Sequence, residues 1–191
     1  MPVSTYALAT LDDVLNYMQT PKDKADDDMN KQLESLIDQL SEVFEGYCGR
    51  QFLSRSFTEY LNGTGTYYLF PKHTPITSVS GIYDNSSWEW TETDLISGTN
   101  YRIQDDNCIV CNTTWNQYNQ NIKIVYTAGY STIPIDVKLA CIEEVVRKWK
   151  NRNSVDVLAI SASDGSVTRY EKNLMPSTFQ VLDRYRNRYV I

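Results

Sequence analysis

The stretch NIKIVYTAGYSTIPIDVKLACIEEVVRKW, residues 121–149, contains the change of period that decides the fold class. Its first part, residues 121–128, alternates and is rich in Ile, Val, Tyr and Thr, as β-strands are. Pro134 fits the first turn of a helix, and the apolar residues after it recur every three or four positions. A strand therefore leads directly into a helix, with Gly129 and Pro134 on either side of the turn.

The helix expected at about 134–150 is apolar on more than one side. Its first stripe is Val137, Cys141 and Val145, and its second is Leu139, Ile142, Val146 and Trp149. A helix with two apolar sides has to be covered on both of them. We expect either a deep core or a core plus a neighbouring subunit, and in the second case the second stripe would form the subunit interface.

Two more helices are expected in the first 50 residues. The first covers residues 7–18, with Thr10 as N-cap and acidic residues in its first turn. The second is the clearest element of the sequence; the acidic run at 26–28 is placed to begin it and Gly49 to end it. The apolar residues that give it helical spacing are Met29, Leu33, Leu36, Ile37, Leu40, Val43, Phe44 and Tyr47.

Between Arg50 and Thr127 the sequence favours β-strands. Tyr, Thr, Ile, Val and Trp are frequent there, and turn residues interrupt them. The pairs Asn62-Gly63 and Asp84-Asn85 predict hairpin turns. The strands are expected at 57–62, 66–70, 76–84, 87–92, 100–103, 107–111 and 121–128.

The C-terminal part is irregular before it becomes helical again. Residues 151–175 are small and polar without clear periodicity, and they could contain a hairpin around Asp164-Gly165. A last helix is expected from about Pro176. Together the elements predict a single α+β domain with a small bundle of three to four helices and an antiparallel β part. Within residues 1–191 its parts would be helical (1–50), β-rich (51–128), a helix (129–150), an irregular loop or hairpin (151–175) and a C-terminal helix or tail (176–191).

The charge is unevenly distributed along the 191 residues. The chain has 18 Lys and Arg against 24 Asp and Glu, a net charge of −6. Residues 1–49 hold three Lys against ten acids, whereas residues 138–191 hold ten bases against six acids. An acidic chain is a poor free binder of nucleic acid, but opposite charge at its two ends can attract other copies or a charged partner. No apolar run is long enough to span a membrane and no secretory signal is visible, so we expect a cytoplasmic site of synthesis.

No set of residues in the sequence predicts catalysis. His73 is the one histidine, and we expect it in a surface turn. Cys108 and Cys111 have the spacing of metal ligands, but in a strand they point to opposite faces, and a closed zinc site needs about four ligands. The pair Asp105-Asp106 lies at an expected strand turn. Nothing visible there would raise the pKa of one carboxyl above that of the other, as acid–base catalysis requires. We therefore expect no enzyme activity, cofactor or metal.

Aromatic residues are numerous, with 14 Tyr, 4 Trp and 5 Phe. Most are explained by sheet packing, but Trp88, Trp90, Trp115 and Tyr118 lie in polar surroundings, and several of them could be exposed. Exposed aromatic side chains suit interfaces, and they also suit carbohydrate recognition. A virion tail accessory protein, or a receptor- or carbohydrate-binding protein, therefore remains an alternative reading.

Five blocks of the sequence, in this order, resemble one family. The most specific are EGYCGRQF at 45–52 and VYTAGYSTIPIDVKLAC at 125–141, while residues 85–120 and 151–175 match only loosely. The blocks are ALATLDDVLNYM (7–18), LIDQLSEVFEGYCGRQF (36–52), LFPKHTPITSVSGIYD (69–84), NIKIVYTAGYSTIPIDVKLACIEEVV (121–146) and LDRYRNRY (182–189). This pattern resembles the head–tail connector (adaptor, head-completion) proteins of tailed bacteriophages.

The resemblance implies a structural role in the virion. Members of that family form a ring, commonly a dodecamer, beneath the portal protein, and C-terminal segments commonly reach the portal. The ring extends the channel through which genomic DNA passes without sequence-specific binding, and it offers a docking surface to the next tail component, a tail terminator, stopper or nozzle. The resemblance implies no cofactor, no catalysis and no membrane; the protein would be made in the host cytoplasm and reside in the neck.

Two further sets of residues acquire expected roles in such a ring. Acids on the polar faces of the second helix would line the channel and repel phosphate: Asp28, Glu34, Asp38, Glu42 and Glu45. Basic and aromatic residues of the last segment would bind the portal: Arg184, Tyr185, Arg186, Arg188 and Tyr189.

Overall fold

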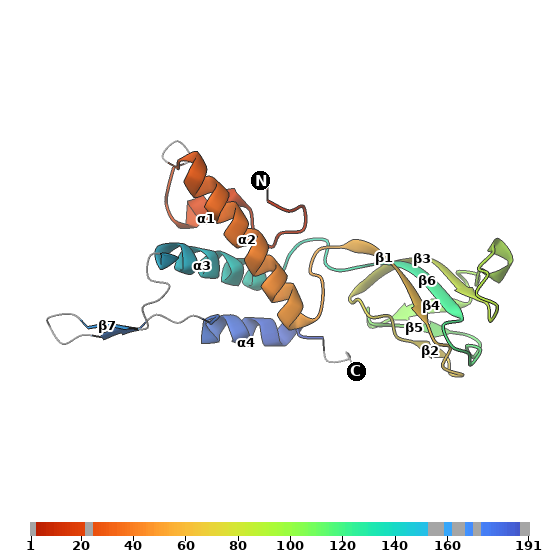
Figure 1. Cartoon of the computed structure of the whole chain (residues 1–191). Helices are drawn as coiled ribbons and strands as arrows, with labels where there is room; N and C mark the ends of the chain where they lie inside the picture. The colour runs from red at the N-terminus through yellow and green to blue at the C-terminus, as the bar shows by residue number, and fades with distance from the viewer. Residues whose placement is uncertain (1–2, 22–24, 153–158, 162–166, 170–172, 188–191) are drawn as a thin grey trace. The chain divides into compact units, whose positions relative to one another are not determined.

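The computed structural model describes residues 3–21, 25–152, 159–161, 167–169 and 173–187 (Figure 1). The chain forms two compact units, a helical unit up to Gly49 and from Ile133, and a β unit from Arg50 to Thr132. The expected α+β class is confirmed, with four α-helices and two three-stranded antiparallel sheets in the described part. None of the helices in these ranges is long and apolar enough to cross a membrane.

Helix α1 begins directly after its predicted N-cap Thr10 but is shorter than the expected 7–18, whereas α2 begins and ends where its capping residues predict. Helix α1 spans Leu11–Tyr17, and Thr10 and Asp13 form a capping box. Helix α2 spans Asp27–Cys48. The carboxylate of Asp26 accepts the N–H of Met29 at 2.6 Å, and Gly49 ends the helix in the left-handed conformation with φ 61°.

Helices α3 (Ile135–Lys150) and α4 (Pro176–Tyr185) complete the helical unit. Pro134 is the N-cap of α3 and not its first helical residue, so the helix begins one residue later than the sequence suggested. Helix α2 packs along α3, and both α1 and α4 contact this pair (Figure 1). The core between them consists of side chains with no exposed area, among them Leu33, Ile37, Leu40, Phe44, Val137, Cys141, Val145 and Leu182.

The β unit consists of two sheets that share one core. The first has the order β1-β6-β3, with β1 at Arg55–Leu61, β6 at Ile122–Ala128 and β3 at Ile76–Asp84. The second has the order β2-β5-β4, with β2 at Tyr68–Leu69, β5 at Cys108–Cys111 and β4 at Tyr101–Gln104. Burial alternates strictly along β6, so every second side chain enters the core. The core contains residues of both sheets, including Leu69, Ile82, Ile109, Cys111, Ile122, Ile124 and Tyr126.

Some of the strand and turn predictions are wrong. Residues 87–92 form no strand, because Asn85 binds the backbone of Ser87 and Glu89 and closes a local turn; a 3₁₀ helix follows at Glu92–Asp94. The pair Asn62-Gly63 forms no hairpin, because β1 pairs with β6 and β2 pairs with β5. After Asp84-Asn85 the chain returns antiparallel to β3, but it pairs there only through an isolated bridge between Leu95 and Tyr83 and forms no second strand of a hairpin.

A small antiparallel pair lies in the segment that the sequence left as a loop or hairpin. Strand β7 spans Ala159–Ser161 and pairs with β8 at Val167–Arg169. This pairing agrees with the expected hairpin, while its turn around Asp164-Gly165 lies outside the described residues.

Candidate assembly surfaces

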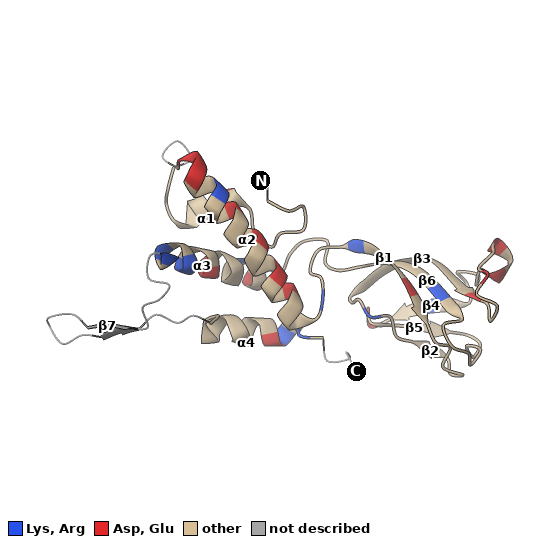
Figure 2. Ribbon diagram, in the orientation of Figure 1, with Lys and Arg blue, Asp and Glu red and all other residues tan. Residues whose placement is uncertain are grey.

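Most of the acids of α2 form a stripe along one flank of the helix. Positions three or four apart lie on one side of a helix, within about 80° for this set. The stripe comprises Glu34, Asp38, Glu42 and Glu45, whereas Asp28 lies outside it near the N-terminus. Lys31 is the one basic residue of the helix. Figure 2 shows acidic positions (red) at intervals along α2. The structure thus brings together four of the five acids that the sequence proposed as channel-lining residues.

The acidic stripe also borders the N-terminal segment of the chain. Asp38 Oδ1 accepts the backbone N–H of Ser4 at 2.9 Å, and Ser41 Oγ accepts that of Leu8 at 2.9 Å. Glu42 remains exposed, and Glu34, Asp38 and Glu45 are half-buried. Acids four apart repel one another by about 0.2–0.5 kcal/mol per pair on an isolated helix, so the spacing of these acids does not by itself stabilise α2.

The second apolar stripe of α3 is mostly covered within the chain itself. Ile142, Val146 and Trp149 are buried, and only Leu139 of this set keeps a large exposed fraction, 44%. Around the helix these residues lie between Lys138 and Glu143, both of which contact α1: Lys138 Nζ is 2.8 Å from Asp13, and Tyr17 Oη donates to Glu143 at 3.4 Å.

Helix α1 therefore accounts for much of the two-sided pattern that suggested a subunit interface. Of the predicted interface residues, Leu139 is the one that a neighbouring copy could still bury substantially. The role of this set in assembly stays a prediction.

The described residues of the basic C-terminal segment contact their own chain. Tyr185 Oη donates to Asp136 at 2.8 Å, and Arg184 Nη1 lies 3.7 Å from the same carboxylate. The guanidinium of Arg186 lies 5.5 Å from the centre of the Tyr47 ring. Arg184 nevertheless keeps 68% of its side chain exposed, so it is available to a partner. Arg188 and Tyr189 lie outside the described residues.

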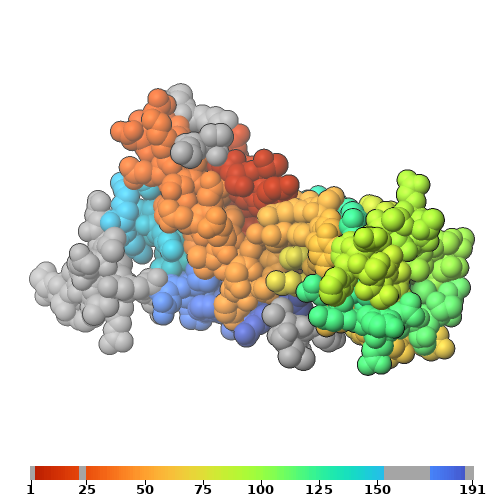
Figure 3. All heavy atoms as spheres, turned by 45° about the vertical axis from the view of Figure 1, so that its right-hand side comes forward, coloured from red at the N-terminus to blue at the C-terminus, as the bar shows by residue number. Residues whose placement is uncertain are grey.

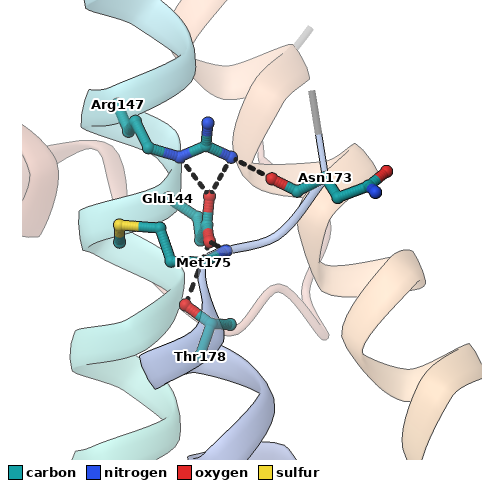
Figure 4. A network of polar contacts seen from close by, with 5 residues as sticks. All are labelled: Glu144, Arg147, Asn173, Met175 and Thr178. Carbon is teal, nitrogen blue, oxygen red and sulfur yellow. Dashed lines mark hydrogen bonds and ion pairs between the residues drawn. The ribbon is translucent and has the colours of Figure 1, made fainter. Parts of the chain in front are cut away.

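The buried carboxylate of Glu144 fixes the start of α4, a role that was not predicted from the sequence. Glu144 has no exposed area and lies on the core side of α3 (Figure 4). Its Oε2 accepts from Nε and Nη2 of Arg147 at 2.8 and 2.6 Å. Its Oε1 accepts the N–H of Met175 at 2.6 Å and the hydroxyl of Thr178 at 3.0 Å.

This network supplies a cap that α4 lacks in its own sequence. Met175, the N-cap residue, makes no side-chain capping bond, so the carboxylate of Glu144 takes that role from another helix. Arg147 Nη2 also donates to the carbonyl oxygen of Asn173 at 2.8 Å. A signal was present in the sequence, because Glu144 stands three residues after Cys141 on an apolar stripe and three before Arg147.

His73 belongs to a cluster at the edge of the β-unit core, not to a free surface turn. Its ring stacks on Phe57 with 3.9 Å between ring centroids, and Nε2 lies 3.5 Å from Glu59. Its backbone N–H donates to Tyr126 Oη at 3.0 Å. Burial lowers the pKa of His73 although Glu59 opposes the shift, and burial raises the pKa of Tyr126.

All four cysteines are buried as free thiols. Burial raises the pKa of Cys141 to about 12 and also raises that of Cys108. The thiols of Cys108 and Cys141 therefore stay protonated and are poor nucleophiles.

Several aromatic side chains of the β unit are exposed, as the sequence suggested. Trp88 and Tyr118 lie mostly in solvent, while Trp115 is buried in the core. The rings of Trp90 and Tyr60 pack in a tilted arrangement with 4.8 Å between their centroids, and Lys123 Nζ lies 5.9 Å from the centroid of the Trp90 ring. Trp90 is thus partly covered by side chains of its own chain.

Comparison with protein families and solved structures gives consistent matches. A family model described as "Head completion protein" matches residues 7–188. None of the curated proteins matches the chain significantly.

Three of the similar solved structures are chains of gene transfer agent (GTA) particles. A chain from the neck of an empty GTA particle, computed with C6 symmetry, is 14% identical with a TM-score of 0.67, over 100% of this chain and 96% of that one. A chain from the virion of the native particle is 13% identical with a TM-score of 0.63, over 95% and 90%. A third, from the native neck computed with C12 symmetry, is 15% identical with a TM-score of 0.58, over 100% and 96%. At these identities the likeness concerns the fold.

Proposed function

We propose that this chain, which belongs to the head completion protein family, is a structural protein of the neck that joins a phage head to its tail. The observation that carries the proposal is the family match over residues 7–188. The fold supports it, because chains from GTA necks and virions share that fold over nearly their whole length.

Within the neck, the chain would act as one subunit of a ring. The similar chains come from necks computed with C6 and C12 symmetry, and a ring of twelve copies, as the resemblance implied, fits both. One side of the ring would bind the portal protein, with Arg184 as an exposed basic contact, and the other would bind the next tail component. The virion would be the site of action, and the host cytoplasm the site of synthesis.

The acidic stripe of α2 suits a wall along which DNA moves. Repeated around a ring, Glu34, Asp38, Glu42 and Glu45 would give a band of negative charge. Phosphates within about 10 Å, the Debye length near 0.1 M salt, would be repelled and would not bind. This would let the genome pass without sequence-specific contacts.

The chemistry of the described residues supports a role without catalysis. The cluster of His73, Glu59 and Tyr126 holds the loop before β3 to the sheet, and the raised pKa of Tyr126 keeps its phenol protonated. Burial also keeps the thiols of Cys108 and Cys141 protonated, so neither they nor Tyr126 provides an activated nucleophile.

The proposal is tested by disrupting the gene in a producing strain and restoring it from a plasmid. We expect filled heads without attached tails in its absence, and tailed particles with density for this chain in the neck after restoration. Tailed, infectious particles that lack the chain would contradict the proposal.

Portal binding is better tested by Arg184→Glu than by removing the C-terminal helix. Leu182 of α4 has no exposed area, so a truncation that includes it would disturb the helical core. Weaker portal binding with an unchanged melting temperature would support the assigned contact, and unchanged binding would remove Arg184 from it.

A further inference from the structure

The sequence holds one Asn-Gly pair, Asn62-Gly63, and the function proposed above makes no use of it. In such a pair the side-chain amide is followed by a residue without a Cβ, so the backbone nitrogen of the glycine reaches the amide carbon with little hindrance. In unfolded peptides an asparagine loses its side-chain amide most readily when glycine follows it. Asn62 is therefore a place where the chain can be modified without an enzyme.

The reaction needs only water and a free backbone nitrogen. The nitrogen of Gly63 gives its proton to water or hydroxide and attacks the side-chain carbonyl carbon of Asn62. A C–N bond forms to the backbone nitrogen, and the side-chain nitrogen takes up a proton and leaves as ammonia. Water then opens the five-membered succinimide at either carbonyl, which gives aspartate or isoaspartate. One amide and one water become one carboxylic acid and one ammonia, so no oxidant or reductant is needed.

The pair lies where the β1–β6 ladder ends. The two strands pair up to their ends, so the chain leaves the sheet at Asn62 opposite the point where it enters at Asn121. Residues 116–121 fold over this place, and the backbone N–H of Gln120 donates to Asn62 Oδ1 at 2.8 Å. Figure 3 shows the two segments, in gold and blue-green, beside each other in the β unit. We call Asn62, Gly63 and the segment 116–121 the β1–β6 corner.

The nitrogen of Gly63 is occupied in the folded chain. Its N–H donates to Asn121 Oδ1 at 2.8 Å and to the carbonyl oxygen of Tyr118 at 3.1 Å. Gly63 is buried, and Asn121 has no exposed area. A buried nitrogen whose proton is held by two acceptors is not free to lose that proton and attack, so these contacts oppose the reaction.

The fold uses both residues of the pair. A Cβ at Gly63 would collide with the carbonyl oxygen of Asn116, so glycine is required for this close approach. The side-chain oxygen of Asn62 accepts the N–H of Gln120, a bond that holds the 116–121 segment over the glycine. The contacts that require an Asn-Gly pair therefore also restrain its chemistry.

The side chain of Asn121 holds the β1–β6 corner together. Its Nδ2 donates to Asp84 Oδ1 at 2.7 Å and to the carbonyl oxygen of Asn116 at 3.0 Å, while its Oδ1 accepts from Gly63. One amide thus links the Gly63 nitrogen, the 116–121 segment and the end of β3. Its loss removes one of the two acceptors of the Gly63 N–H and loosens the segment that carries the other.

We propose that Asn62-Gly63 is a latent deamidation site, which the side chain of Asn121 keeps closed in the folded chain and which opens when the β1–β6 corner frays. The isoaspartate product adds a methylene group to the main chain directly before Gly63, where the approach to Asn116 leaves no room for a Cβ. A chain that has opened and reacted in this way does not regain the native corner. This property does not depend on a role in the neck.

Peptide mapping by mass spectrometry tests the proposal on the full chain. At mildly alkaline pH, we expect conversion at Asn62 to be about tenfold slower or more in the folded wild type than in the same chain in urea, because the reaction waits for an opening. Asn121→Ala should convert about tenfold faster than the folded wild type, and Asn62→Gln identifies the reacting position by removing the signal. Equal rates in the folded and the urea-unfolded wild type would overturn the proposal.

A matched core variant separates the local contact from overall stability. Ile109→Ala opens the same β-unit core but alters none of the groups that bind the Gly63 nitrogen. Urea brings this variant and Asn121→Ala to the same unfolded fraction, and Asn121→Ala should still deamidate faster there. Equal rates would mean that Asn121 does not close the site.

A second measurement needs no variant. In native-state hydrogen exchange of the wild type, the amide of Gly63 should be protected as strongly as the amides of β6, because its two acceptors hold it in the folded chain. Rapid exchange at Gly63 in a chain whose Asn62 stays intact would overturn the assigned protection.

Discussion

Replacing Glu144 by alanine should be among the most destabilising single changes in the helical unit. The carboxylate is fully buried and accepts four hydrogen bonds, two from Arg147 and one each from Met175 and Thr178. Removing one member of a buried ion pair costs about 3–5 kcal/mol, because the partner charge loses its compensation. Arg147 is 17% exposed and keeps its bond to the carbonyl of Asn173, so we expect the lower end, about 3 kcal/mol.

Urea denaturation followed by circular dichroism and by tryptophan fluorescence measures this loss, because Trp149 lies on the same helix. Hydrogen exchange adds the location: amides of α4 should lose protection before those of α2, since the cap of α4 is removed first. The double variant Glu144→Leu with Arg147→Met should recover a large part of the loss, because an apolar pair needs no compensation.

Glu143→Ala is the matched control. Glu143 is adjacent on α3, but its contact with Tyr17 is exposed and 3.4 Å long, so its removal should cost less than about 0.5 kcal/mol. Equal effects of the two substitutions, or a loss below about 1 kcal/mol for Glu144→Ala, would refute the reasoning that the buried network holds α4 in place.

Three further outcomes are expected. Gly46→Ala should raise the free energy of unfolding by about 1 kcal/mol in urea titrations, because it improves helix propensity in open space; a decrease would mean that Gly46 is needed within its own chain. Burial lowers the folded-state pKa of His73 below its unfolded value, so the unfolded chain binds its proton more readily. Stability should therefore fall as the pH drops below about 6.5, and His73→Gln should flatten that part of the pH profile of unfolding; an unchanged profile would contradict this. Asn121→Ala should cost about 2–3 kcal/mol in thermal or urea unfolding, since the buried amide holds Gly63 and Asp84; a loss near zero would show that these loops need no such tie.

The ends of the helices could be predicted because their signals are local. Asp26 and Met29 are three residues apart, and a capping bond between them needs no other part of the chain. Gly49 ends α2 because it adopts the left-handed conformation, which glycine reaches without a steric penalty. The alternation in β6 likewise depends only on which of its side chains enter the core.

The pairing of the strands could not be predicted in this way. Gly63 suggested a hairpin because it is a turn residue, but its N–H donates to the side chain of Asn121, which is 58 residues away. A Cβ at Gly63 would collide with the carbonyl group of Asn116, so the glycine serves a close approach between loops. A local turn and a close approach between distant loops both require glycine at position 63. The sequence alone does not distinguish these two reasons.

The assembly surfaces were predicted in part for a similar reason. Helical periodicity correctly separated two sides of α3, but it does not say whether α1 or another subunit covers the second side. The pair Asp13–Lys138, which fixes α1 there, joins residues 125 positions apart. Glu144 was missed because a carboxylate among apolar positions reads as an interruption of the stripe until its partners in α4 are known.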